Sequence, residues 1–259
     1  MSLGSYPFGA PLRRVVQEDR SPKRVFVLGV YASAVHARWL GPDGRQLVRA
    51  LAVASEPAIF WTGDGAAEIV SGIEVPPSAG RLVPAEQSNG PSGRALDADF
   101  LGPLGVARQD AWLCDLVPHT CLNADQKKAV AEKYVPRLGL GLPPVNLPDV
   151  PSSFADDERR EEIHEELRIS GAEIVVLLGD QPIRWWLSHF DSRWRALSDF
   201  GRTAAEYGRL HRSTIAARRV RILPVAHPRQ VAGLGWHSPE WRALHASWRE
   251  NVAPELLGV

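Results

Sequence analysis

Polar side chains that could do chemistry follow three apolar runs of the chain. Tyr31 and Ser33 follow the run 25–28, Asp115 and His119 lie in and after the run 111–118, and His227 and Arg229 follow the run 220–226. Imidazole and carboxylate groups are common general acids and bases. Such side chains could act together if the three strand ends converge. A single histidine near a strand end, taken alone, is more often a structural hydrogen-bonder.

Several familiar sites are disfavoured by the local sequence. Ser33 lacks the Gly-x-Ser-x-Gly elbow of hydrolases, and its simplest role is to cap a helix. Gly29 and Gly179 belong to no dinucleotide-binding or Walker pattern. His119 and Cys121 have no second pair of ligands, so zinc is not expected. We expect no cofactor and no metal.

The apolar runs predict buried parallel strands, because each is short and several are bounded by glycine. The strands are expected at 25–28, 111–118, 172–179 and 220–226. Helices are expected at 32–40, 94–104, 123–134 and 155–169, with others starting at Asp180 and Ser238. This alternation predicts a three-layer α/β/α fold with a central, mostly parallel, four-stranded sheet. Ligands of such sheets bind beyond the carboxyl ends of the strands. Residues 29–33 and the His227 loop would then form two lips of one site.

Local signals add detail to this outline. Leu47–Ala54 and Ala58–Trp61 could form a strand pair, and Asn123 reads as a helix N-cap with Gln126 completing a capping box. Residues 1–22 are interpreted as an N-terminal arm packed on the sheet. The proline-rich segment 136–153 could mark a domain boundary, but strand patterns resume beyond it. We therefore expect a single domain over residues 1–259.

Composition limits the class of protein. Thirty basic and thirty acidic residues balance, so no global basic field marks a non-specific nucleic-acid binder. Residues 209–229, however, hold six arginines, two histidines and no acid. Two cysteines cannot form a disulfide framework. With no signal sequence and no apolar run of about 20 residues, we expect a cytoplasmic monomer with no membrane partner.

The order of the motifs is more informative than any one of them. A strand and Gly29-x-Tyr31-x-Ser33 are followed by Gly90-Pro91-Ser92-Gly93-Arg94-Ala95-Leu96-Asp97 at a helix start. Then come Trp112-Leu113-Cys114-Asp115-Leu116-Val117, the strand ending at Gly179, and His227-Pro228. Over residues 24–235 this series resembles the uracil-DNA glycosylase superfamily, in layout closest to its Gly-Glu-x-Pro-Gly branch.

The resemblance implies DNA repair by base flipping, because a base inside the stack cannot be attacked at its glycosidic bond. Gly29, Val30, Tyr31, Ser33 and Asp115 would bind the base or sugar. His227 would lie near the charge that develops on the leaving base. The residues expected to meet the phosphates of single- or double-stranded DNA are Ser92, Arg94, Arg212, Arg218, Arg219, Arg221 and Arg229.

The chain departs from that branch at specific positions. Tyr31 stands where several branches carry the residue that orients water, and Asp115 replaces the asparagine that reads uracil. An ionised carboxylate only accepts hydrogen bonds, so Asp115 suits a base edge with an amino donor, or could itself activate water. The cluster cysteines are missing, and no iron–sulfur cluster is expected. Two functions follow: a DNA N-glycosylase with altered base choice, in which Asp115 and His227 are the catalytic residues, or a non-catalytic relative that binds a nucleotide, a nucleic-acid end or a protein.

Overall fold

The computed structural model describes residues 3–233 and 239–258. Within them the chain forms two compact units, each made of separate segments. Unit 1 comprises residues 3–15, 31–91 and 118–152, and unit 2 comprises 16–30, 92–117, 153–233 and 239–258. The expectation of a single domain stays a prediction.

Unit 2 is built on a five-stranded sheet with the order β5-β1-β6-β8-β7. Its strands are β1 (Val25–Tyr31), β5 (Ala111–Val117), β6 (Ile174–Leu178), β7 (His211–Ile215) and β8 (Arg218–Val225). β1 and β6 run parallel, as do β6 and β8, whereas β7 is antiparallel to β8. All residues of β5 and β6 are buried, which explains the unbroken apolar sequence of β6 and the apolar sequence of β5 apart from Asp115. The four expected strands are confirmed, and β7 was not expected.

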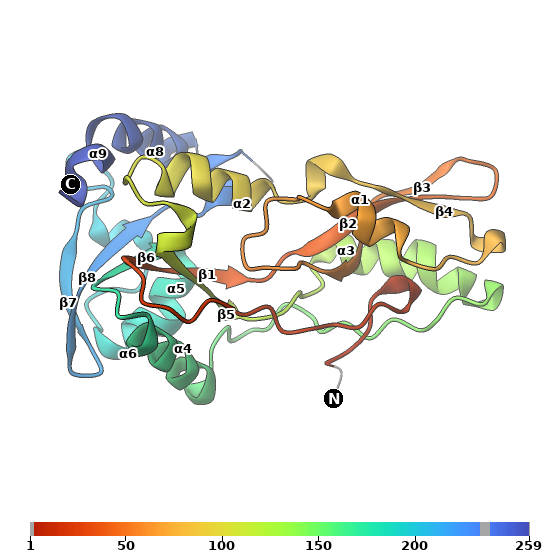
Figure 1. The fold of residues 1–259 in the computed structure, drawn as a ribbon, viewed down its shortest axis with the longest axis horizontal. Coiled ribbons are helices and arrows are strands. Elements are labelled where there is room, and N and C mark those ends of the chain that lie inside the picture. The colour runs from red at the N-terminus through yellow and green to blue at the C-terminus, as the bar shows by residue number, and fades with distance from the viewer. Residues whose placement is uncertain (1–2, 234–238, 259) are drawn as a thin grey trace. The chain divides into compact units, whose positions relative to one another are not determined.

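Helices cover both faces of this sheet. They are α2 (Pro91–Ala95), α4 (Asp157–Ser170), α5 (Asp180–Pro182), α6 (Ser188–Phe190), α7 (Pro228–Val231), α8 (Pro239–Asn251) and α9 (Ala253–Leu256). π-helical turns extend α2 through Leu96–Leu101 and join α5 to α6 through Ile183–Leu187. Figure 1 shows α2 and α8 on one side of the sheet and α4 and α6 on the other. The fold is thus α/β with a mostly parallel sheet, compatible with three layers.

One of the expected helix starts differs in detail. Asp180 does not cap its helix, because its Oδ1 accepts the N–H of Leu197 at 2.7 Å and Gly179 holds the N-cap position. The expected start of the last helix at Ser238 lies outside the described residues, and α8 runs from Pro239.

Unit 1 holds a three-stranded antiparallel sheet with the order β3-β2-β4. Its strands are β2 (Ala34–Leu40), β3 (Gln46–Ser55) and β4 (Arg81–Pro84), and its helices are α1 (Ala66–Ser71) and α3 (Ala124–Ala129), which a π-helical turn, Val130–Tyr134, extends. Short 3-10 turns occur at Pro7–Gly9, Pro77–Ala79, Glu86–Ser88 and Val135–Leu140. The N-terminal arm packs here, with Phe8 edge-on to Trp39 at 5.4 Å between ring centroids.

The helix expected at 32–40 is wrong, because these residues form β2. Val35, Ala37 and Trp39 are buried while Arg38 between them is exposed. That period of two is the pattern of a strand with one covered face. The strand expected at Ala58–Trp61 is also wrong: Phe60 has φ 52°, and β3 pairs with β2 instead.

Asn123 caps α3 as expected, and its side chain accepts the N–H of Gln126 at 3.0 Å. The capping box is not completed. The amide of Gln126 bonds instead to the N–H of Ala52 and the carbonyl of Ala50, each at 2.9 Å. Gln126 therefore fixes α3 to β3.

Candidate functional site

Three parallel strands of unit 2 end at one edge of the sheet. Leu28 of β1 is level with Leu177 of β6, which is level with Pro224 of β8. The chain order of the strands reverses between β1 and β6, since β5 lies on the other side of β1. Ligands of open α/β sheets bind beyond the carboxyl ends of the strands at such a reversal. This edge, which we call the carboxyl edge, is the candidate site.

Gly179, directly after β6, brings the backbone close to His227. Its φ of 82° favours glycine, and its N–H donates to the carbonyl of Val225 at 2.8 Å. A Cβ at this position would lie 3.2 Å from the Cβ of His227. The glycine thus lets the β6 and β8 ends meet at the carboxyl edge. Gly29, which is buried, and Val30, which is half-buried, belong to the same edge at the end of β1.

His227 is the N-cap of α7. Its Nδ1 accepts the backbone N–H of Arg229 at 3.1 Å, and Pro228 occupies the first turn. Burial, together with the charge of Arg229, lowers the pKa of His227 to about 4. At neutral pH the ring is therefore neutral. Since Nδ1 is the acceptor, the hydrogen-bond network assigns the proton to Nε2, which can donate to a ligand.

A buried hydrogen-bonded chain lies behind the His227 loop. The phenol of Tyr207 accepts the N–H of Ala226 and bonds to Nδ1 of His245 at 2.8 Å. The other nitrogen of His245 bonds to the carbonyl of Asp99 at 3.0 Å. This series of hydrogen bonds joins the end of β8 to α8 and to the π-helical turn after α2. It restricts how far the His227 loop can move.

Asp115 lies inside β5 and is only 3% exposed. Its Oδ1 is buried and has no hydrogen-bond partner in the part of the chain that the structure describes. Burial raises the pKa of Asp115 to about 7, an effect that Arg159 opposes and Glu166 increases. Asp115 is therefore a carboxyl group that can be protonated near neutral pH, when it can both donate and accept hydrogen bonds.

Arg159 of α4 neutralises the neighbourhood of Asp115. Its Nη2 donates to the carbonyl of Asp115 at 2.7 Å and approaches Sγ of Cys114 at 3.3 Å. Its Nη1 contacts Glu162 at 2.6 Å and Glu166 at 3.4 Å. Burial is the main reason that the pKa of Cys114 is well above its usual value, so this thiol is inert.

Tyr31 and Ser33 are assigned to unit 1. Ser33 caps no helix, because the segment that follows is β2. Its N–H donates to Oε1 of Glu56 at 2.9 Å, and its carbonyl accepts from the hydroxyl of Thr120. Glu56 is only 5% exposed and was not anticipated from the sequence. A glutamate before a proline in a turn carries no signal of such a contact.

Three of the expected contacts with DNA lie on helices of unit 2. Ser92 is half-buried and Arg94 exposed in α2, and Arg229 is exposed on α7. Arg229 is thus the expected phosphate contact that adjoins His227 in the chain.

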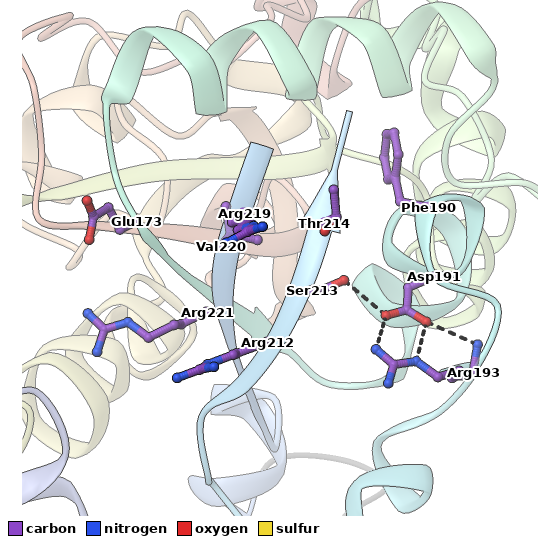
Figure 2. Close-up of a pocket in the computed structure, with 10 residues that line it drawn as sticks. All are labelled: Glu173, Phe190, Asp191, Arg193, Arg212, Ser213, Thr214, Arg219, Val220 and Arg221. Carbon is purple, nitrogen blue, oxygen red and sulfur yellow. Dashed lines mark hydrogen bonds and ion pairs between the residues drawn. The ribbon is translucent and has the colours of Figure 1, made fainter. Parts of the chain in front are cut away.

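The other arginines lie elsewhere. Arg221 precedes His227 by six residues, which corresponds to about 20 Å at roughly 3.3 Å per residue. Arg212 pairs with Arg221 across the β7–β8 ribbon, and Arg219 lies further still from His227. These arginines therefore lie along the β7–β8 ribbon, away from the His227 loop, and Figure 2 shows them on that ribbon.

Arg218 is used within the protein. Its guanidinium donates to the carbonyls of Leu167, Gly171 and Ala172 at 2.8–3.0 Å and so caps the end of α4. These donors are engaged within the protein, and the expected phosphate contact of Arg218 stays a prediction.

Across the two described ranges, every helix falls short of the length and apolar character that a bilayer-spanning segment needs. In the same ranges, His, Cys, Asp and Glu side chains do not gather in threes in an arrangement that could hold a metal ion. Comparison with known proteins finds no family model and no curated relative that matches this chain.

Proposed function

We propose that this chain is a divergent relative of the uracil-DNA glycosylases and hydrolyses the N-glycosidic bond of a flipped, damaged or deaminated base in DNA. The observation that carries the proposal is the position of His227. It follows the last parallel strand, adjoins Gly179 at the carboxyl edge, and has a neutral ring whose Nδ1 is an acceptor, so that Nε2 carries the proton. The motif order supports the same function.

His227 would act on the leaving base. Water adds its oxygen to C1′ of the sugar while the C1′–N bond breaks, and the base departs with the bonding electrons. The proton released by water finally reaches the base nitrogen. A fixed donor aimed at the developing negative charge lowers the barrier, and removing one such donor typically costs a factor of about 10²–10³ in rate.

Asp115 would read the base edge. A buried acceptor without a partner is costly, and a bound base could satisfy its Oδ1. Protonated, Asp115 offers one donor and one acceptor, the same pair as an amide, and matches N3–H and O4 of uracil. Ionised, it suits an amino group such as N4 of cytosine. With a pKa of about 7, the preferred base should change as pH rises through neutrality.

The test is excision from oligonucleotides that each carry one altered base, such as uracil, hypoxanthine or xanthine, scored for abasic sites. We expect wild-type protein to release at least one base, and His227→Ala to slow release about 10²–10³-fold. His189→Ala, an exposed histidine on α6, is the matched control and should leave the rate unchanged. Asp115→Asn should favour uracil at every pH. No product from any substrate would refute catalysis.

A non-catalytic nucleotide-binding relative is the second candidate. Residues 30–33 contain no carboxylate, and Oε1 of Glu56 accepts the N–H of Ser33. If this is the function, the same oligonucleotides should bind and remain intact. His227→Ala would then weaken binding without changing the amount of product.

A further inference from the structure

Three arginines share one face of the β7–β8 ribbon in unit 2. Arg212 lies directly across from Arg221, and Thr214 across from Arg219. Arg219 and Arg221 are two residues apart in β8, so their side chains leave the strand on the same face. All three arginines are exposed. We call Arg212, Arg219 and Arg221 the ribbon arginines. Figure 2 shows Arg212 and Arg221 extending to the same side of the ribbon.

The ribbon arginines make no ion pair with an acidic side chain among the residues that the structure describes. In the described part of the chain, no hydrogen bond or ion pair engages their guanidinium groups, whereas Arg193 pairs with Asp191 at 2.6 Å. Glu173 lines the same surface and makes no ion pair with them. Their positive charge is therefore available to a partner.

This arrangement is unfavourable for the isolated protein. Like charges directly opposite each other on two strands destabilise the pair, and Arg212 and Arg221 occupy such positions. An anion between the two guanidinium groups would remove the repulsion. Each guanidinium is a planar fork that matches phosphate oxygens in a bidentate way.

The space beside the ribbon is large and open. A hollow of about 780 Å³ is lined by the ribbon arginines, Ser213 and Thr214, together with the Arg193–Asp191 ion pair and Glu173. Two residues along a strand rise about 6.8 Å, so the arginines present a row of cations rather than one enclosed charge. A row of cations fits a polymer with regularly spaced negative charges better than a single small anion.

We propose that the ribbon arginines bind the phosphodiester backbone of a nucleic acid at a surface separate from the carboxyl edge. The inference that the partner is a phosphate-bearing polyanion rests on the charges of the ribbon arginines. The inference that this polyanion is a nucleic acid rests on the proposed function. Nucleic acid with one charge per about 1.7 Å of duplex axis supplies such a row. The separation of about 20 Å along β8 means that this surface holds DNA outside the site that reads the base.

The test measures binding of a fluorescent 20-nucleotide DNA without altered bases, single-stranded and duplex, by anisotropy at several salt concentrations. The variant carries Arg212→Ala, Arg219→Ala and Arg221→Ala. We expect at least a ten-fold loss of affinity at low salt and a salt slope lower by about 3, roughly 1 per phosphate contact. The control carries Arg184→Ala, Arg195→Ala and Arg202→Ala, which removes the same charge from exposed positions of unit 2. It should keep the wild-type slope.

Further arms separate the outcomes. Replacing the ribbon arginines by lysine should restore most of the affinity, because the charge is kept, and thermal melting checks that each variant is folded. Wild-type protein that binds no DNA at low salt, or two triple variants with equal slopes, would overturn the proposal. If the triple alanine variant loses binding to vesicles that contain anionic phospholipid but keeps its affinity for DNA, the surface would be assigned to a membrane instead. Because this DNA carries no altered base, failure here is distinct from failure of base excision.

Discussion

The phenolic oxygen of Tyr207 accepts the backbone N–H of Ala226 at 2.7 Å, one residue before His227. Since the oxygen is the acceptor in that contact, its hydrogen is directed at Nδ1 of His245. The second ring nitrogen of His245 then donates to the carbonyl of Asp99. Every polar atom in this series of hydrogen bonds has a partner. The loop that bears His227 is attached to the series through the backbone N–H of Ala226.

Tyr207→Phe should therefore act on both stability and the His227 loop. It leaves the buried N–H of Ala226 without an acceptor, which costs about 1–3 kcal/mol of unfolding free energy. Urea unfolding measures this loss, and NMR of the His227 ring measures the change in its surroundings. Tyr134→Phe is the matched control, because the phenol of Tyr134 likewise accepts a backbone N–H, that of Phe8 at 2.8 Å. It should destabilise the protein without shifting the His227 resonances. Equal spectra for the two variants would show that Tyr207 does not position the loop.

Asp115→Asn should change the pH dependence of stability. The carboxyl has a pKa of about 7 in the folded protein and 3.8 when unfolded. Between these values the folded state binds more protons, so the wild-type unfolding free energy falls as pH rises from about 4 to 7. The asparagine variant has no such pH dependence. Its free energy of unfolding at pH 8 should therefore be higher than that of the wild type by roughly 1–3 kcal/mol.

Urea unfolding of both proteins at pH 5 and pH 8 checks the prediction. The difference between them isolates Asp115, because other groups titrate in both. A variant that loses as much stability as the wild type between these pH values would place the pKa of Asp115 near its ordinary value.

His227 and His245 should have the opposite effect in acid. Burial lowers the pKa of each to about 4, below the 6.5 of an unfolded histidine. Between these values the unfolded chain binds more protons, so stability is lost as pH falls from about 6.5 to 4. His227→Gln should lose less stability than the wild type over this range. Ring proton resonances of His227 that titrate near pH 6.5 would contradict the assignment of a neutral imidazole.

The parallel strands could be predicted because each is buried on both faces. A strand such as Ile174–Leu178 has an unbroken apolar sequence, which a buried position requires whatever packs against it. The strand β2 was missed although Val35, Ala37 and Trp39 alternate with polar residues, because its small residues also suit a helix. Local composition does not determine whether these residues form a helix or a strand. The strand forms because β2 pairs with β3.

The candidate site was only partly foreseeable for a similar reason. His227 follows a recognisable strand, so its place at the carboxyl edge could be expected from the chain order. The contacts of Glu56 with Ser33 and of Arg218 with three carbonyls depend on segments far apart in sequence. Residue type alone cannot distinguish an arginine that caps a helix from one that binds phosphate.

The hairpin that joins β7 to β8 gives a last prediction. Ile215 pairs with Arg218, so Ala216 and Ala217 form a two-residue turn, with φ of 44° and 66°. Positive φ at both positions is the type I′ geometry, for which Asn-Gly is strongly preferred. Two alanines give no such signal, and β7 was accordingly missed.

Replacing the two alanines should stabilise the turn. An alanine with positive φ costs about 1–2 kcal/mol of folding free energy. Glycine avoids this cost, but part of the gain is cancelled because glycine gives the unfolded chain more conformational freedom. The double variant Ala216→Asn, Ala217→Gly should therefore be more stable by about 1 kcal/mol. Thermal unfolding measures the gain, and unchanged DNA affinity would show that the ribbon arginines keep their register. Ala246→Gly, exposed in the interior of α8, is the control and should lower stability by about 1 kcal/mol. A double variant no more stable than the wild type would mean that the turn is not strained.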